Sequence, residues 1–387
     1  MGINVLLTAI GMGLLWGIMA IGVYITYRVL NYADLTAEGS FTLGAAVAAW
    51  YIVLNGGDPF WGTFIAAGAG VLAGIMTGFF HTVLKVPPLL SGILSMTALY
   101  SINLRVMQHN ANIPIRRGTA TIMSRMAGVL GNNERSAVIV LSVVFGVAIL
   151  NLVLFYINIY RKNKKRLRMG EELPKRRVPV GVWFAGAGVV LAAGYVITLL
   201  NETAMTQLAV WFPANERIAS IFVGFIFVIV VIFLLKLFFN TEIGYALRAT
   251  GDNDTMVKAQ GVNTNLMKIL GLVLGNACVA LSGALVFQLQ GFADINMGIG
   301  TIVIGLASVI IGEVIFSDKR SHRVFNAVVL GSILYRIIIA FVLNRNIHPN
   351  DLRLISALLL ALVLALPMLR AKFNIDLKKL ITGRGAQ

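Results

Sequence analysis

Charged residues are scarce in this 387-residue chain, at 12% of the total. Soluble domains carry roughly 25%, so the sequence excludes an ordinary soluble protein and a disordered one. Its single cysteine, Cys278, excludes an internal disulfide. With nine prolines and no low-complexity tract, a fibrous protein is excluded as well.

Apolar residues make up 58% of the chain, with 39 glycines and a mean hydropathy of +0.84. Glycine is more frequent in membrane helices than in soluble ones. A bilayer span needs about 20 apolar residues and must be helical, because lipid cannot pair with backbone groups. The sequence therefore predicts an all-α polytopic membrane protein. Its eleven predicted spans cover 4–28, 36–54, 60–84, 89–107, 136–160, 180–200, 218–239, 265–290, 297–316, 324–343 and 354–370.

Basic residues outnumber acidic ones by 32 to 16. They gather in short segments between the apolar runs, so we expect them to set membrane orientation rather than to bind nucleic acid. Nine lie within 161–179, which we place in the cytoplasm together with the basic tail 371–387. The C-terminus is then cytoplasmic.

Motifs for catalysis are missing from the sequence. It has no phosphate-binding Gly-x-x-x-x-Gly-Lys-Ser/Thr loop, no His-Glu-x-x-His zinc pattern and no Gly-x-Ser-x-Gly elbow. We therefore expect no catalytic residues, no metal and no cofactor in this chain, and we do not expect an enzyme.

Residues 31–44 form an unusual start to a membrane helix, because Asp34 and Glu38 lead directly into an apolar run. This is either a cytoplasmic loop with Thr36 as helix N-cap or a broken helix buried at membrane depth. The sequence after Asp294 weakly repeats the pattern after Asp34, with glycines that interrupt an apolar run. Such paired segments are typical of a transport site.

The segment 241–261 is polar and lies between two predicted spans. Asp252 or Asn253 can cap a short helix, and Gly261 is suited to end it. A helix of this length is unstable alone. We expect either a docking site for a partner or an ordinary ordered loop.

Several of these runs resemble the permease subunits of ABC importers, in the subclass for branched-chain amino acids and simple sugars. The resemblance is carried by 35–45, 241–264 and 271–275. Four further runs resemble a branch associated with aromatic amino-acid uptake, of tryptophan or tyrosine type. They are 91–94, 99–105, 111–114 and 291–300. The resemblance covers 1–125 and 218–370.

The resemblance implies a type II importer fold with a cytoplasmic coupling helix at about 248–261. It also implies a bacterial plasma membrane, two permease copies that we expect to be identical, an external solute-binding protein and separate ATPase subunits that hold ATP and magnesium. The residues that it implies for ATPase contact are Arg248, Ala249, Gly251, Asp252, Asn253, Ala259 and Gly261.

Polar residues within or beside the spans are candidates for the solute pathway, because charge at membrane depth is costly. Those we assign to it are Asp34, Thr36, Glu38, Ser40, Thr42, Ser91, Ser95, Asn103, Asp294 and Asn296. For Ser91, Ser95 and Asn103, which share one helix face, the alternative is a role in holding helices together. Arg336 could belong to a structural ion pair.

Two other functions stay open. An ion-coupled secondary transporter would use Asp34, Glu38 and Asp294 as its ion sites, and a membrane scaffold would need none of them. The predicted organisation is a first transmembrane half at 1–135, a two-helix insertion at 136–217, a second half at 218–370 and the tail at 371–387.

Overall fold

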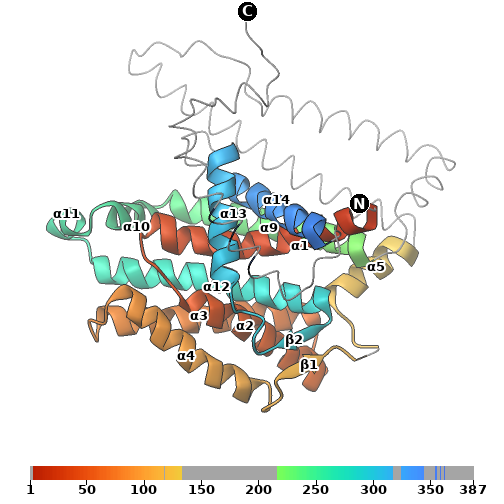
Figure 1. The fold of residues 1–387 in the computed structure, drawn as a ribbon. Coiled ribbons are helices and arrows are strands. Elements are labelled where there is room, and N and C mark those ends of the chain that lie inside the picture. Colours follow the sequence, from red (N-terminus) through yellow and green to blue (C-terminus); the bar gives the residue numbers. More distant parts are fainter. Residues whose placement is uncertain are drawn as a thin grey trace, which may run out of the picture. The chain divides into compact units, whose positions relative to one another are not determined.

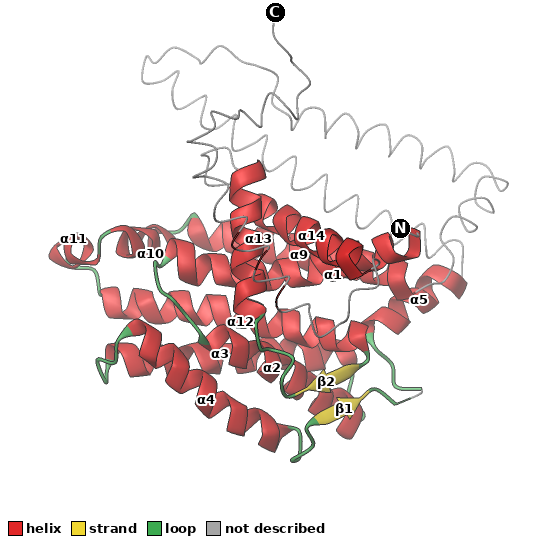
Figure 2. Cartoon of the chain, viewed as in Figure 1, coloured by secondary structure: helices red, strands yellow, loops and turns green. Residues whose placement is uncertain are grey.

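The computed structural model describes residues 3–116, 118–132, 216–316 and 324–343, with the isolated positions 354, 358 and 361. It divides into two compact units, one formed by Met1–Ile122 with Leu234–Gln387 and one by Met123–Phe233. Within the described ranges the chain is helical apart from two short strands (Figure 2).

The elements follow in chain order (Figure 1). They are α1 (Ile3–Tyr24), η1 (Ile25–Val29), α2 (Thr36–Ala49), η2 (Trp50–Leu54), α3 (Pro59–Thr82), α4 (Pro88–Val106), β1 (Asn112–Pro114), α5 (Ile122–Asn132), α9 (Glu216–Phe239), α10 (Glu242–Asp252), α11 (Asp254–Ala259), α12 (Thr264–Gln290), β2 (Phe292–Asp294), α13 (Thr301–Phe316) and α14 (Val324–Leu343). The η elements are single turns of π-helix that extend α1 and α2.

Among the described residues, seven helices are long and apolar enough to cross a membrane, and they coincide with seven of the predicted spans. They cover Asn4–Val29, Thr36–Leu54, Pro59–Thr82, Pro88–Val106, Arg217–Phe239, Thr264–Gln290 and Val324–Leu343. The predicted span 297–316 is a shorter helix that begins at Thr301. The predictions at 136–160, 180–200 and 354–370 lie outside the described residues, as does the loop 161–179.

Helix α12 lies at the centre of the first unit, where it packs against α1, α2 and α3. Small residues make this possible, because they let helix backbones approach closely. A Cβ at Gly44 of α2 would lie 1.9 Å from the Ala280 carbonyl oxygen, and one at Gly283 of α12 would lie 2.0 Å from that of Phe41. Both positions therefore require glycine.

The chain leaves the helical conformation before the second membrane helix. After η1, Asn31 adopts a left-handed conformation (φ 52°), and residues 31–34 have no regular secondary structure before α2 begins at Thr36. Asp34 is only 3% exposed and Thr36 is fully buried. Asp34 and Thr36 thus lie inside the protein, and a broken helix at membrane depth stays a prediction. The predicted N-cap is wrong by one residue: Leu35 occupies that place and has no side-chain acceptor, so Asp34 accepts the Thr36 N–H instead.

In the second unit, α5 packs on the first part of α9. Ala127 and Ala219 are buried against each other, with Met126, Ile218 and Phe222 around them. Small side chains again permit close helix packing.

Candidate functional site

A buried carboxylate, Asp34, lies at the start of α2. Its Oδ1 accepts the Thr36 N–H at 3.0 Å, and its Oδ2 accepts from Asn276 Nδ2 of α12 at 2.7 Å. The Oδ1 of Asn276 in turn accepts from the Ser40 hydroxyl at 2.6 Å. Both Asn276 and Ser40 are fully buried. A buried polar group is tolerated when it is hydrogen-bonded in this way, and these contacts fix α2 against α12.

A second set of polar contacts joins α2 to α3 and α4. The Thr36 hydroxyl lies 2.7 Å from that of Thr77, which donates to Ser95 at 2.8 Å. Asn103 donates to the Gly39 carbonyl at 3.2 Å, and the hydroxyl of Ser91 is hydrogen-bonded to that of Tyr32. These side chains are buried between helices, which agrees with the helix-holding interpretation of Ser91, Ser95 and Asn103. Their pathway role remains a prediction.

The two segments with a similar glycine pattern, 34–42 and 291–301, lie against each other. Glu38 is half-buried, and its Oε1 accepts the Gly300 N–H at 3.0 Å. Gly298 is packed so closely on the same turn of α2 that a Cβ there would lie 2.0 Å from the Glu38 carbonyl oxygen. Thr42 donates back to that carbonyl at 3.3 Å. The sequence predicted both segments as parts of one site, and the structure brings them together.

Asp294 and Asn296 lie further along the same loop. Asp294 Oδ1 accepts the Asn296 N–H at 2.8 Å, and its Oδ2 accepts from Asn112 Nδ2 at 3.3 Å. Asn112 and Asp294 are paired residues of the antiparallel strands β1 and β2 (Figure 2). Asn112 lay within a run that carries the resemblance, but its polar contact with Asp294 was not predicted.

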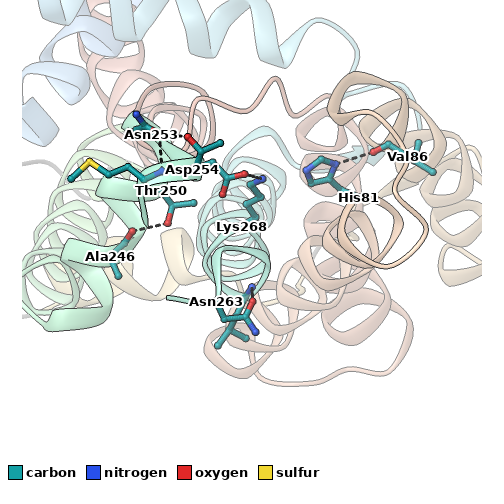
Figure 3. Close-up of polar contacts among 11 residues, drawn as sticks. His81, Val86, Ala246, Thr250, Asn253, Asp254, Asn263 and Lys268 are labelled. Carbon is teal, nitrogen blue, oxygen red and sulfur yellow. Dashed lines mark hydrogen bonds and ion pairs between the residues drawn. The ribbon is translucent and has the colours of Figure 1, made fainter. Parts of the chain in front are cut away.

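The polar stretch 241–261 forms two helices, α10 and α11, where one was predicted. Asn253 is extended (φ −156°, ψ 94°), so it ends α10. Its side chain then caps α11 by accepting the Met256 N–H at 3.0 Å (Figure 3). Gly261, at φ +84°, follows the end of α11 as expected.

An ion pair fastens α11 to the start of α12. Lys268 Nζ lies 2.8 Å from Asp254 Oδ2 (Figure 3). The hydrogen bond from Lys268 holds the pKa of the Asp254 carboxyl below its usual range. The pair therefore persists at mildly acidic pH and is lost only as pH falls through that lowered value.

The seven predicted coupling residues separate into two groups. Five of them, Ala249, Asp252, Asn253, Ala259 and Gly261, are exposed. The other two contact the protein itself: the Arg248 guanidinium lies 4.7 Å from the Phe239 ring centre, and a Cβ at Gly251 would lie 1.9 Å from the Val29 carbonyl oxygen. These two residues seat α10 on α9 and η1.

Sequence reasoning missed two large side chains on the same segment. Tyr245 is 59% exposed and Met256 is 57% exposed. The signal was available, since each is an apolar residue on a short polar helix, and such exposed side chains are frequent at docking surfaces.

No cluster of three or more His, Cys, Asp or Glu residues that could hold a metal ion occurs in the part of the chain that the structure describes.

The apolar helices of spanning length among the described residues place the chain in the class of integral membrane proteins. The chain belongs to the family described as the branched-chain amino acid transport system permease component, whose model matches residues 5–163 and 176–367. This confirms the resemblance inferred from the residues. The match also extends through most of 136–217, where the sequence predicted an insertion.

Two relatives extend over nearly the whole chain. A tyrosine transport system permease protein of Clostridioides difficile (strain R20291) is 33% identical over 95% of this chain and 91% of its own length. An uncharacterized protein of Rickettsia prowazekii (strain Madrid E) is 28% identical over 94% of this chain and 97% of its own. No solved structure matches the chain.

Proposed function

We propose that this chain is the membrane-spanning subunit of an ATP-driven importer in a bacterial plasma membrane. Two copies form the solute pathway, two ATPase subunits bind their α10–α11 segments, and an external binding protein delivers the solute. ATP and magnesium are held by the ATPase, and the C-terminus of this chain is cytoplasmic. Family membership supports this assignment over an ion-coupled transporter or a scaffold.

The observation that carries the proposal is the two-sided character of the α10–α11 segment. Its outer side exposes Ala249, Asp252 and Tyr245, which are free to contact a partner. On its inner side, Gly251 touches η1 at the beginning of the extended stretch that leads to Asp34. A movement of α10 is therefore passed to the start of α2.

The proposed solute is an amino acid of aromatic type. The support is the Clostridioides difficile relative, which is named for tyrosine transport and shares a third of its residues with this chain. Tyrosine is thus the first solute to test.

Co-purification with an ATPase tests the docking. The tagged permease is expressed in its host, extracted in a mild detergent and recovered through the tag, and any P-loop ATPase that co-purifies is identified by mass spectrometry. The docking variant carries Ala249→Glu and Asp252→Lys, both at exposed positions. The control is Asn55→Lys, an exposed position in the connection between α2 and α3.

We expect the ATPase to be retained by the wild type and by the control, and lost from the docking variant. Opposite charges and added bulk at a contact surface disfavour association. An ATPase that binds the docking variant as well as the wild type would contradict the assignment of this surface. If no ATPase binds even the wild type, the importer proposal itself fails.

A further inference from the structure

Three buried polar atoms without hydrogen-bond partners lie on α1, α13 and α14. They are Trp16 Nε1, Thr301 Oγ1 and Arg336 Nε. The Trp16 side chain is 5% exposed and Thr301 is 1% exposed. Buried polar groups are nearly always paired in native proteins, so each exception requires an explanation. Among the described residues six such atoms occur, and half of them belong to these three mutually packed helices.

A series of contacts connects the helices that carry these residues, and we call the region from Trp16 to the start of α13 the Trp16 junction. The Arg336 guanidinium lies 3.9 Å from the centre of the Trp16 indole, and the indole centre lies 5.0 Å from the ring of Phe41 on α2. A Cβ at Gly305 of α13 would lie 3.1 Å from Met19 Sδ, one turn along α1 from Trp16. Trp16 is in the middle of the span Asn4–Val29, so the junction lies near the membrane centre.

The N-terminus of α13 already binds a carboxylate at this junction. Glu38, one turn before Phe41 on α2, accepts the Gly300 N–H at 3.0 Å, immediately before Thr301 begins α13. The free N–H groups and the positive dipole end of a helix favour an anion there. The Thr301 hydroxyl adds a further donor in the same turn.

Arg336 supplies a positive charge to the same region. No carboxylate of the described residues forms an ion pair with it, and its Nε is sealed from solvent without an acceptor. The Trp16 ring stabilises the cation through its π-face but accepts none of its N–H groups. A guanidinium binds a carboxylate through two parallel hydrogen bonds.

We propose that the Trp16 junction binds the carboxylate of the transported amino acid as it passes the membrane centre. This inference rests on the proposed function and adds the recognition chemistry. The solute carboxylate accepts hydrogen bonds from Trp16 Nε1, Arg336 and the Thr301 hydroxyl. Without solute, Glu38 accepts the Gly300 N–H. When the solute binds, its carboxylate takes the place of Glu38 at this helix end.

Binding to the full-length permease in lipid nanodiscs tests the proposal. The probes are L-tyrosine and L-leucine, each compared with the amine that lacks the carboxylate, tyramine and isoamylamine. Binding is followed by scintillation proximity with the tritiated amino acid. The variants are Arg336→Met, which removes the guanidinium and its charge, and Thr301→Val and Trp16→Phe, which remove one donor each. Arg105→Met, at an exposed arginine of α4, is the matched control.

We expect at least one amino acid to bind about ten-fold or more tightly than its amine, and Arg336→Met to remove that difference, because a charge-assisted hydrogen bond is lost. Thr301→Val and Trp16→Phe should weaken binding severalfold, and Arg105→Met should leave it unchanged. Leucine binding with this pattern and no tyrosine binding would refute the tyrosine assignment alone and support the site.

The proposal is overturned if neither amino acid binds the wild type more tightly than its amine, or if Arg336→Met binds as the wild type does. It is also overturned if Glu38→Gln and Arg336→Met give the same loss of thermal stability and no change in binding. That result would assign Arg336 to an internal ion pair with Glu38. The importer proposal is tested separately, by co-purification of the ATPase. Its failure would therefore be distinguishable from failure of the carboxylate site in the binding experiment.

Discussion

At the scale of single residues, Asp34 depends on partners far away in the chain. Its Oδ2 is held by Asn276, and Asn276 also accepts from Ser40. Asp34 could be singled out from the sequence because a carboxylate next to a membrane span is costly. Its hydrogen-bond partner Asn276 could not be predicted. Asn276 is one of several polar residues on α12, and the local sequence does not show which of them contacts Asp34.

Replacing Asn276 by leucine should destabilise the protein strongly. The change leaves the Asp34 carboxylate and the Ser40 hydroxyl buried without one partner each, at a cost of about 3 kcal/mol. Replacing both Asp34 and Asn276 by leucine should cost less than Asn276→Leu alone, because no buried carboxyl group is then left without its partner. The apparent melting temperature in detergent, read from tryptophan fluorescence, measures both effects.

Asn240→Leu provides the control, since Asn240 is exposed at the end of α9 and should melt like the wild type. A melting temperature for Asn276→Leu equal to that of this control would show that the Asp34 contacts contribute nothing to stability.

At the scale of elements, α10 packs against η1, which precedes the stretch that leads to α2. Gly251 has no room for a side chain because the Val29 carbonyl lies against it. Sequence reasoning placed a short polar helix here, and the two-helix form escaped it because Asp252 and Asn253 are equally good caps. Only the extended backbone of Asn253 decides between them.

Gly251→Val should separate docking from transport. The added side chain forces α10 away from η1, while the exposed docking residues stay unchanged. We expect the ATPase to co-purify as with the wild type and ATP-driven uptake to fall severalfold. Gly68→Val, where a Cβ meets no atom within 4 Å, should leave both unchanged.

If Gly251→Val transports at the wild-type rate, the contact with Val29 does not couple α10 to α2. If it loses the ATPase, its effect is on docking rather than on transmission.

At the scale of the whole molecule, composition and the lengths of the apolar runs were sufficient to predict a helical membrane protein. Seven of the predicted spans are helices of spanning length in the structure. The shortness of α13 was not foreseen, because the run 297–316 is mostly apolar, with its one charge, Glu313, near the far end, and its glycines do not reveal where a helix begins. Its start is fixed by tertiary contacts, since Glu38 of α2 binds the Gly300 N–H.

The most direct test of the central claim is solute uptake into proteoliposomes. The vesicles contain the permease with its ATPase facing the lumen. ATP is enclosed in the lumen, and the solute-binding protein is added outside. We predict that labelled tyrosine accumulates only when ATP and all three proteins are present, and that collapsing the ion gradients leaves the uptake unchanged. Accumulation by the permease alone, driven by an ion gradient and abolished when that gradient is collapsed, would contradict the account.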